Sequence, residues 1–513
     1  MRHMNSPLQV PFTEKTRHLL LDTDSRKLAM EIRDLPYADV PSALLMAHRR
    51  LHTFNRFSLP PAKRLELLRP FHYAFVRFVE HYRRHFEGGA FARELNPNEL
   101  DNLTDFLREM GYGFKHLIHD TLDSNKRPGN MGLILFMAMN YLYYYALFSY
   151  NRGRMLQPSY WQEVHYLYFT ACTLQQHQTQ LAAPEGKQVV IEQLYKQLIM
   201  LGLSSPFSLS PEEQWRTHDY LSRFATFAAI HADADSQDFQ ESYSIFPDCT
   251  QPAAVPYQGE SIRPGARLLD LSQLVDNLQR HLEAIKGGES LRLIGMDRLQ
   301  RGPVVDLLLK LYRNWTRNPL RKNPRTPINE QIGIVWGLEN ICAMLDPNLR
   351  RHGTQSNGNN RAWAQGDNES SYGICLRMSD DNDRAPEAGQ VIALIRQQGQ
   401  QKRLEVGLVQ WSAIDQDNQP CCGVECLRGN TRKISVVAES DSELNTERNG
   451  LLVVTKAGNN RARSLLLAPS GTLKQGGRAR IFSPHHVDAL LAEAYAVTQR
   501  TRQAEVFEVR ILE

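Results

Sequence analysis

The chain has 513 residues, of which 42% are hydrophobic and 23% are charged. This composition is ordinary for a soluble globular protein of several domains, and it excludes a disordered or collagen-like chain. The net charge is only +4, from 60 Lys and Arg against 56 Asp and Glu, so a surface built throughout to bind nucleic acid is also excluded. The seven cysteines include no Cys-x-x-Cys pair and are too few for a disulfide scaffold, which favours a reducing, cytoplasmic compartment.

The first 232 residues are expected to form an all-helical domain. In residues 62–82, apolar side chains recur at three- and four-residue steps, as they do on one face of a helix. These side chains are Leu65, Leu68, Phe71, Phe75, Phe78 and Tyr82. A following helix from Asn98 is expected to stop near Gly111 and Gly113, because glycine commonly ends helices. Two capping boxes predict later helix starts, Ser159 with Gln162 and Ser210 with Glu213.

The stretch from Asn130 to Asn151 contains no charged residue and is long enough to span a bilayer. Tyrosines are spread through its middle as well as its end, at positions 141, 143, 144, 145 and 150. Because tyrosine prefers the membrane rim to the bilayer centre, we expect a helix buried in a soluble bundle and no transmembrane segment. The N-terminal stretch has three consecutive leucines as its apolar run, which is far short of a signal-peptide core.

Beyond the helical part, the chain changes to short strand-like segments. A polar, proline-containing linker or hairpin is expected first, then a helix over about 268–285 that ends at Gly287 and Gly288, and another helix over 304–315. After Thr326, apolar runs separated by turn residues indicate a small antiparallel barrel. These runs are QIGIVWGL, GICLRM, QVIALIRQ, EVGLVQW and CGVECL. Similar runs after Arg432 predict a second small β-rich unit.

The predicted fold class is therefore multidomain α+β. An all-helical domain is followed by a six-stranded antiparallel β-barrel and a small C-terminal β-rich unit. The expected domains are 1–232 (helical), 233–300 (linker and helix), 301–431 (barrel) and 432–513 (β-rich unit).

Six cations and no acid occur between Leu307 and Asn329. The cations are Lys310, Arg313, Arg317, Arg321, Lys322 and Arg325. Pro319 and Pro324 prevent one continuous helix, so the last arginines are expected on a looped segment directly before the first strand. Guanidinium groups there could bind a phosphate or the edge of guanine through two hydrogen bonds. A basic stretch alone is more often a solvated linker.

A second motif, Asn368-x-Ser370-x-x-Gly373, directly precedes and begins the run GICLRM. Together with Arg321-x-x-x-Arg325, it resembles the two signature motifs of the PilZ domain, R-x-x-x-R and [D/N]-x-S-x-x-G. The resemblance covers roughly residues 317–430 and includes the later strand-like runs. Between the two motifs, residues 326–367 also contain an expected short helix, LENICAML, and an expected polar loop, GTQSNGNNRAWAQGDN.

PilZ domains are six-stranded barrels that bind cyclic di-GMP, and the resemblance implies the same ligand here. The residues expected to bind it are Arg321, Arg325, Asn368, Ser370 and Gly373, with Arg317 and Lys322 as additional candidates. The arginines would hold the phosphates and the guanines, and the asparagine and serine would contact a guanine edge. The glycine would let the backbone approach the ligand closely.

The sequence thus predicts a cytoplasmic cyclic di-GMP receptor in which the barrel acts on the helical domain, and the helical domain binds a protein partner. No GGDEF-type or EAL-type motif occurs, and neither enzymatic activity, a cofactor nor a nucleic-acid partner is expected. Two alternatives stay open. One is a degenerate PilZ scaffold that binds a protein without nucleotide, and the other is a small-barrel protein that binds nucleic acid through its basic junction.

No metal site is expected either. His48 with His52, and His81 with His85, have the four-residue spacing of zinc ligands on one helical face, but no third ligand is evident from the sequence. Cysteines 421, 422 and 426 are expected as small buried hydrophobic residues.

Overall fold

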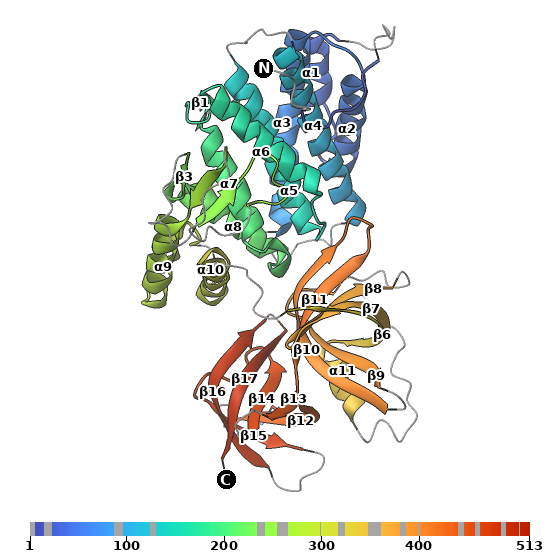
Figure 1. The fold of residues 1–513 in the computed structure, drawn as a ribbon, viewed down its shortest axis with the longest axis vertical. Helices are drawn as coiled ribbons and strands as arrows, with labels where there is room; N and C mark the ends of the chain where they lie inside the picture. The colour runs from blue at the N-terminus through green and yellow to red at the C-terminus, as the bar shows by residue number, and fades with distance from the viewer. Residues whose placement is uncertain are drawn as a thin grey trace. The chain divides into compact units, whose positions relative to one another are not determined.

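The computed structural model describes residues 6–14, 23–86, 96–123, 130–232, 242–253, 265–297, 299–316, 324–346, 361–379, 386–398, 401–439, 446–456, 462–483, 489–501 and 503–512. The chain divides into two compact units, residues 1–319 and residues 320–513. The first unit is mainly helical, and the second contains two closed β-barrels (Figure 1). The predicted α+β multidomain class is confirmed.

In its described residues, the first unit contains the helices α1 to α10 and two small antiparallel sheets. The helices are α1 (Ser25–Arg33), α2 (Val40–Asn55), α3 (Pro61–Phe86), α4 (Pro97–Asp123), α5 (Met131–Asn151), α6 (Pro158–Thr173), α7 (Ile191–Leu203), α8 (Pro211–Phe224), α9 (Ser272–Lys286) and α10 (Arg301–Thr316). One sheet pairs β1 (Leu181–Ala182) with β2 (Gln188–Val189). The other has the order β3 (Ala229–His231), β5 (Arg267–Asp270), β4 (Ser242–Ile245).

Helix α3 confirms the helix predicted over residues 62–82, whereas α4 differs from the prediction. The stop expected at Gly111 and Gly113 is wrong, since α4 continues to Asp123. A Cβ atom at Gly113 would lie 2.6 Å from Leu68 Cδ2 on α3. Gly113 therefore permits close packing of two helices and does not end one.

The two predicted capping boxes have different outcomes. At the start of α8, Ser210 and Glu213 form the reciprocal box, with each side chain bonded to the backbone N–H of the other residue. At the start of α6, the N-cap is Gln157 and makes no side-chain capping bond. Ser159 lies inside the first turn of that helix, one residue after Pro158, so the box expected there is wrong.

Helix α5 is long and apolar enough to cross a membrane, and 78% of its most apolar 18-residue window is buried within the helical unit. Two of its tyrosines have buried hydrogen-bond partners. The hydroxyl of Tyr141 lies 2.7 Å from His72 Nδ1, and that of Tyr143 lies 2.6 Å from His218 Nδ1. Buried hydroxyl groups need such partners, so the tyrosines fit the centre of a protein core, as expected from the sequence.

The segment that follows α8 packs into the helical core. Helices α9 and α10 place apolar side chains in the same cluster as α1 to α8. Leu307, Leu311 and Trp315 of α10 are fully buried there, because an amphipathic helix requires an apolar surface against which to pack. The boundary between the two units consequently follows α10, at 319/320, whereas the predicted barrel domain begins at 301.

The second unit is formed by twelve strands in the described part of the chain. The first barrel contains β6 (Thr326–Trp336), β7 (Arg361–Glu369), β8 (Gly373–Met378), β9 (Val391–Gln398), β10 (Gln401–Ile414) and β11 (Pro420–Leu427), with α11 (Leu338–Leu345) after β6. The second barrel contains β12 (Asn430–Ala438), β13 (Arg448–Lys456), β14 (Ala462–Pro469), β15 (Arg478–Phe482), β16 (Leu490–Arg500) and β17 (Ala504–Leu512). The expected small β-rich unit is thus a complete closed barrel.

Both barrels have the same topology. When the strands of each barrel are numbered from one to six, the order around the closed sheet is 1-2-3-6-5-4 in both cases. A shared hydrophobic cluster joins the two barrels. It includes Val391, Val406 and Leu408 from the first and Leu451, Val453, Leu467 and Val506 from the second. The two barrels therefore form one unit with a repeated fold.

Candidate functional site

The connection between β7 and β8 carries the asparagine–serine motif. The backbone N–H of Ser370 donates to the carbonyl of Gly373 at 2.8 Å, and Ser370 Oγ accepts from the N–H of Tyr372 at 3.4 Å. Ser370 therefore closes a tight turn. Tyr372, within that turn, is 65% exposed and presents an aromatic ring to solvent.

Gly373 has a structural role inside the barrel wall. A Cβ atom at this position would lie 2.7 Å from the carbonyl oxygen of Val424 on the neighbouring strand β11. Real Cβ atoms are not found so close to a backbone oxygen, so any other residue would push β8 and β11 apart. Close strand packing thus explains the glycine without a ligand contact.

Arg325 and Asn368 lie side by side although 43 positions separate them in sequence. Strands β6 and β7 pair antiparallel, with Thr326 opposite Glu369 and Pro327 opposite Asn368. This register places the residue before β6 beside the end of β7. Arg325 Nη1 donates to Asn368 Oδ1 at 2.9 Å in an exposed position. The structure therefore brings together one residue from each predicted motif.

Three of the predicted cations lie outside the described residues, namely Arg317, Arg321 and Lys322. Of the predicted site, the described part comprises Arg325, Asn368, Ser370 and Gly373. All four lie at one end of the first barrel, at the start of β6 or in the β7–β8 hairpin.

A layer of charged side chains closes the same end of the barrel. Glu330 on β6 and Arg396 on β9 each lie two residues from a side chain of the barrel interior, Ile332 and Leu394 respectively. Alternate residues of a strand face the same side. Arg428 directly follows the last residue of β11. Charged groups therefore follow the apolar interior directly at this end.

Glu369 joins these charges to the hairpin. Its Oε1 accepts from Arg396 Nη1 at 2.9 Å and from Arg428 Nη2 at 2.8 Å. Arg396 also donates to Glu330. The hydrogen bond from Arg396 is the main reason that the pKa of Glu369 lies below its usual value, with further lowering by the charges of Arg396 and Arg428. The carboxylate is thus held ionised beneath the candidate site.

Arg428 also contacts the candidate site, although neither of the two motifs predicts it. Besides Glu369, its Nη2 contacts the carbonyl oxygen of Ser370 at 3.1 Å, and its side chain is 42% exposed. Arg428 and Arg432 are four residues apart, with Arg428 two residues before β12 and Arg432 within that strand. The repeated R-x-x-x-R spacing is the sequence signal that could have identified Arg428.

Residues 26–235 match the model of a family described as "Cyclic-di-GMP receptor FimW, N-terminal domain". This segment runs from α1 past β3 and lies within the helical unit. The matched segment covers less than half of the chain, and the description of the family names a cyclic di-GMP receptor. No curated protein matches the chain.

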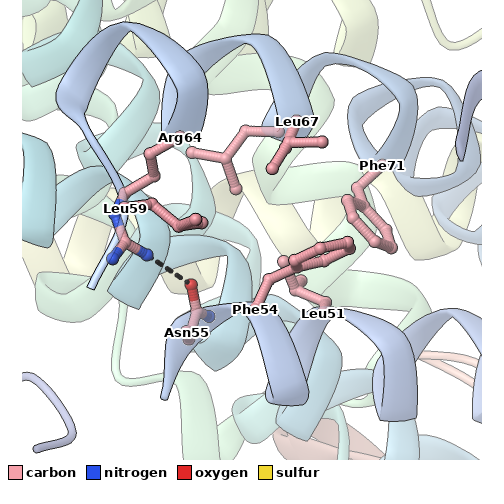
Figure 2. A pocket seen from close by; sticks show the side chains of 8 residues that line it. Leu51, Phe54, Asn55, Leu59, Arg64, Leu67 and Phe71 are labelled. Carbon is pink, nitrogen blue, oxygen red and sulfur yellow. Dashed lines mark hydrogen bonds between the residues drawn. The ribbon is translucent and has the colours of Figure 1, made fainter. Parts of the chain in front are cut away.

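A cavity in the helical unit is too small for a nucleotide. It lies between α2 and α3 and is lined by the eight side chains that Figure 2 draws, six of them apolar. Its volume of about 10 Å³ would hold about one water molecule. Its polar lining consists of Asn55 and Arg64, which bond each other through Arg64 Nη1 and Asn55 Oδ1 at 3.4 Å.

The cysteines of β11 are buried, as predicted. Burial raises the pKa of the Cys421 thiol to about 11 and that of the Cys426 thiol to about 12. Such thiols are protonated at neutral pH and are therefore poor nucleophiles. They fit the role of small hydrophobic residues in the barrel wall.

Proposed function

We propose that the chain is a cytoplasmic cyclic di-GMP receptor of the PilZ type, and that the ligand binds at the end of the first barrel around Arg325, Asn368 and Ser370. The observation that supports this proposal most directly is the hydrogen bond between Arg325 and Asn368. Two motifs that are far apart in sequence become neighbours on a six-stranded barrel, as a shared ligand site requires.

The chemistry of the site suits a dianionic ligand with purine rings. Arg325 is exposed and can turn its guanidinium from Asn368 toward a phosphate or the edge of a guanine. Arg428 supplies a second partly exposed guanidinium beside the Ser370 carbonyl. Arg396 is occupied by the two acids below the hairpin, so we assign it to the support of the site and not to ligand contact.

Two separate parts of the chain favour the same ligand. The motifs lie in the first barrel, whereas the segment that resembles the cyclic di-GMP receptor family lies in the helical unit. Neither observation depends on the other. Their agreement favours a nucleotide receptor over the degenerate scaffold and over a nucleic-acid-binding barrel.

The test is calorimetric titration of cyclic di-GMP into the wild type and into Arg325→Ala and Asn368→Ala variants. We expect micromolar binding, roughly −8 kcal/mol, and a loss of at least tenfold in each variant. Arg377→Ala is the matched control, because Arg377 is an arginine of the same barrel with 41% of its side chain exposed. If the folded wild type shows no heat of binding, the result would support the alternative of a degenerate PilZ scaffold that does not bind nucleotide. Unchanged binding by both variants would exclude this site, and Arg317 and Arg321 would be changed next.

We further propose that the ligand changes the geometry between the helical unit and the barrels. Helix α10 ends at Thr316 and β6 begins at Thr326, so the predicted arginine motif lies in the stretch of chain that joins them. A dianion bound there would connect that junction to the first barrel, and the helical unit would then present a surface to a protein partner. Identical small-angle scattering profiles with and without saturating ligand would contradict this coupling.

A further inference from the structure

Two histidines of α2 face two acids of α4. His48 and His52 are one turn apart on α2, and Asp105 and Glu109 are one turn apart on α4. Residues four positions apart share a helical face, so the histidine pair and the acid pair form two opposed rows. The sequence shows no third ligand for the histidines, but the packing of α2 against α4 provides Glu109.

The ligand atoms of three of these residues are close together. One nitrogen of His48, one nitrogen of His52 and one carboxylate oxygen of Glu109 lie within 4.8 Å of one another. His52 Nδ1 is 3.0 Å from Glu109 Oε1. Two ligands that each lie about 2 Å from a zinc ion are at most about 4 Å apart, so small side-chain movements would complete the coordination.

Neighbouring residues hold the carboxylate in place. Glu109 is 3% exposed, and Asn55 Nδ2 donates at 2.7 Å both to Glu109 Oε2 and to the Glu109 carbonyl oxygen. Asn55 is in turn fixed by Arg64, as Figure 2 shows. Such hydrogen bonds behind a ligand orient it and increase metal affinity. Arg56 Nη1 also contacts both carboxylate oxygens at 2.7 Å, and its positive charge limits the affinity.

We propose that His48, His52 and Glu109 form a binding site for a divalent metal ion of the zinc type. Two imidazole nitrogens and one carboxylate oxygen are a ligand set that zinc accepts, with water in the fourth position. The side chain of His52 is 52% exposed, so solvent reaches this ligand. Asp105, one turn along α4, also lies near His48, but its ion pair with Arg108 at 2.6 Å offsets its negative charge.

The test uses the full chain without an affinity tag and Co²⁺ as the probe, because four-coordinate Co²⁺ absorbs visible light and occupies sites with zinc ligands. We expect the wild type to bind one Co²⁺ and to release it to added Zn²⁺. The variant with His48→Ala and His52→Ala should bind at least tenfold more weakly. Circular dichroism checks that the helices are retained. If the double variant does not fold, the single variant His52→Ala is used in its place.

The control is the variant with His81→Ala and His85→Ala. These histidines have the same spacing on α3, and their ring centroids are 5.1 Å apart, compared with 6.0 Å for the pair on α2. Among the described residues, no acid or cysteine completes a three-ligand group with them. The control should therefore bind Co²⁺ like the wild type. Absence of Co²⁺ absorption in the wild type, or equal affinity of the wild type and the site variant, would overturn the proposal.

Discussion

At the scale of single residues, Gly373 has two competing explanations, close packing of strands and close approach of a ligand. The resemblance assigns this glycine to close approach of a ligand, whereas the structure places the carbonyl oxygen of Val424 2.7 Å from where a Cβ would be. We predict that Gly373→Ala destabilises the barrel unit by about 1–3 kcal/mol, because β8 and β11 must separate. Chemical denaturation checks this.

Ser371→Ala is the comparison for this prediction, because Ser371 is the exposed residue in the middle of the same turn. Its substitution should change the free energy of unfolding by less than about 0.5 kcal/mol. Equal stability of the Gly373→Ala variant and the Ser371→Ala variant would show that the barrel accommodates the methyl group, and the packing explanation would then be wrong.

At the scale of secondary-structure elements, α4 contains two glycines with different surroundings. A Cβ at Gly113 would meet Leu68 Cδ2 at 2.6 Å, whereas no atom lies within 4 Å of a Cβ at Gly111. We predict that Gly111→Ala stabilises the helical unit by about 0.5–1 kcal/mol, the difference in helix propensity. Gly113→Ala should destabilise it by about 1–3 kcal/mol, because Leu68 is buried and must move. Thermal unfolding of both variants tests this, and stabilisation by both would show that α3 and α4 are not closely packed at this point.

Buried histidines make the helical unit sensitive to acid. Burial lowers the pKa of His116 and of His165 to about 4 and that of His218 to about 3. In the unfolded chain histidine has a pKa of about 6.5, so the unfolded state binds more protons between these values. The free energy of unfolding should therefore be greatest above about pH 6.5 and decrease steadily toward pH 4.

The contribution of His218 to the pH dependence of stability can be tested with the variant His218→Gln. Glutamine does not titrate, and its amide can still bond the hydroxyl of Tyr143, which His218 contacts at 2.6 Å. We predict a smaller change in melting temperature of this variant between pH 6.5 and pH 4 than in the wild type. His85→Gln, a change at a partly exposed position of α3, should leave the slope unchanged. Parallel curves for the wild type and the His218→Gln variant would contradict the prediction.

Elements could be predicted from sequence wherever the local pattern agrees with the tertiary structure. The run GICLRM coincides with β8, and CGVECL lies within β11. Among the described strands of the two barrels, the sequence does not predict β7 and β16. Strand β7 lies in the expected polar loop, with small Ala362 and Ala364 facing the interior, and β16 has the alanine-rich sequence LLAEAYAVTQR, which favours a helix. Both are strands because neighbouring strands pair with them along their length.

The residues of the candidate sites could likewise be predicted only where a local sequence pattern marks them. The motifs identify Arg325, Asn368 and Ser370, since those residues follow fixed local spacings. Glu109 could not be found in this way, because it joins His48 and His52 only through the packing of two helices. Arg428 could be predicted only in part. Its spacing from Arg432 is visible in the sequence, but its contact with Glu369 depends on the fold.

At the scale of the whole molecule, the two repeated barrels share a buried apolar cluster. The outer faces of β9 and β10 place Val391, Val406 and Leu408 in a cluster with Leu451 and Val506 of the second barrel. All five are essentially inaccessible to solvent. The predicted division at residues 431 and 432 would cut through this cluster and expose an apolar surface on each part.

We therefore predict that residues 320–513 form a soluble fragment with a single cooperative unfolding transition, whereas residues 320–429 aggregate when expressed alone. The apolar wall of the first barrel needs the second barrel to cover it, and an exposed apolar patch of this kind promotes association. Size-exclusion chromatography and calorimetry of the two fragments test this. Leu408→Lys should make the short fragment more soluble, because the charge is solvated by water there. It should make the long fragment less stable, because the charge would be buried in the shared apolar cluster. If the short fragment is monomeric and folded without any substitution, the first barrel is independent, and the second barrel must have some other role than covering it.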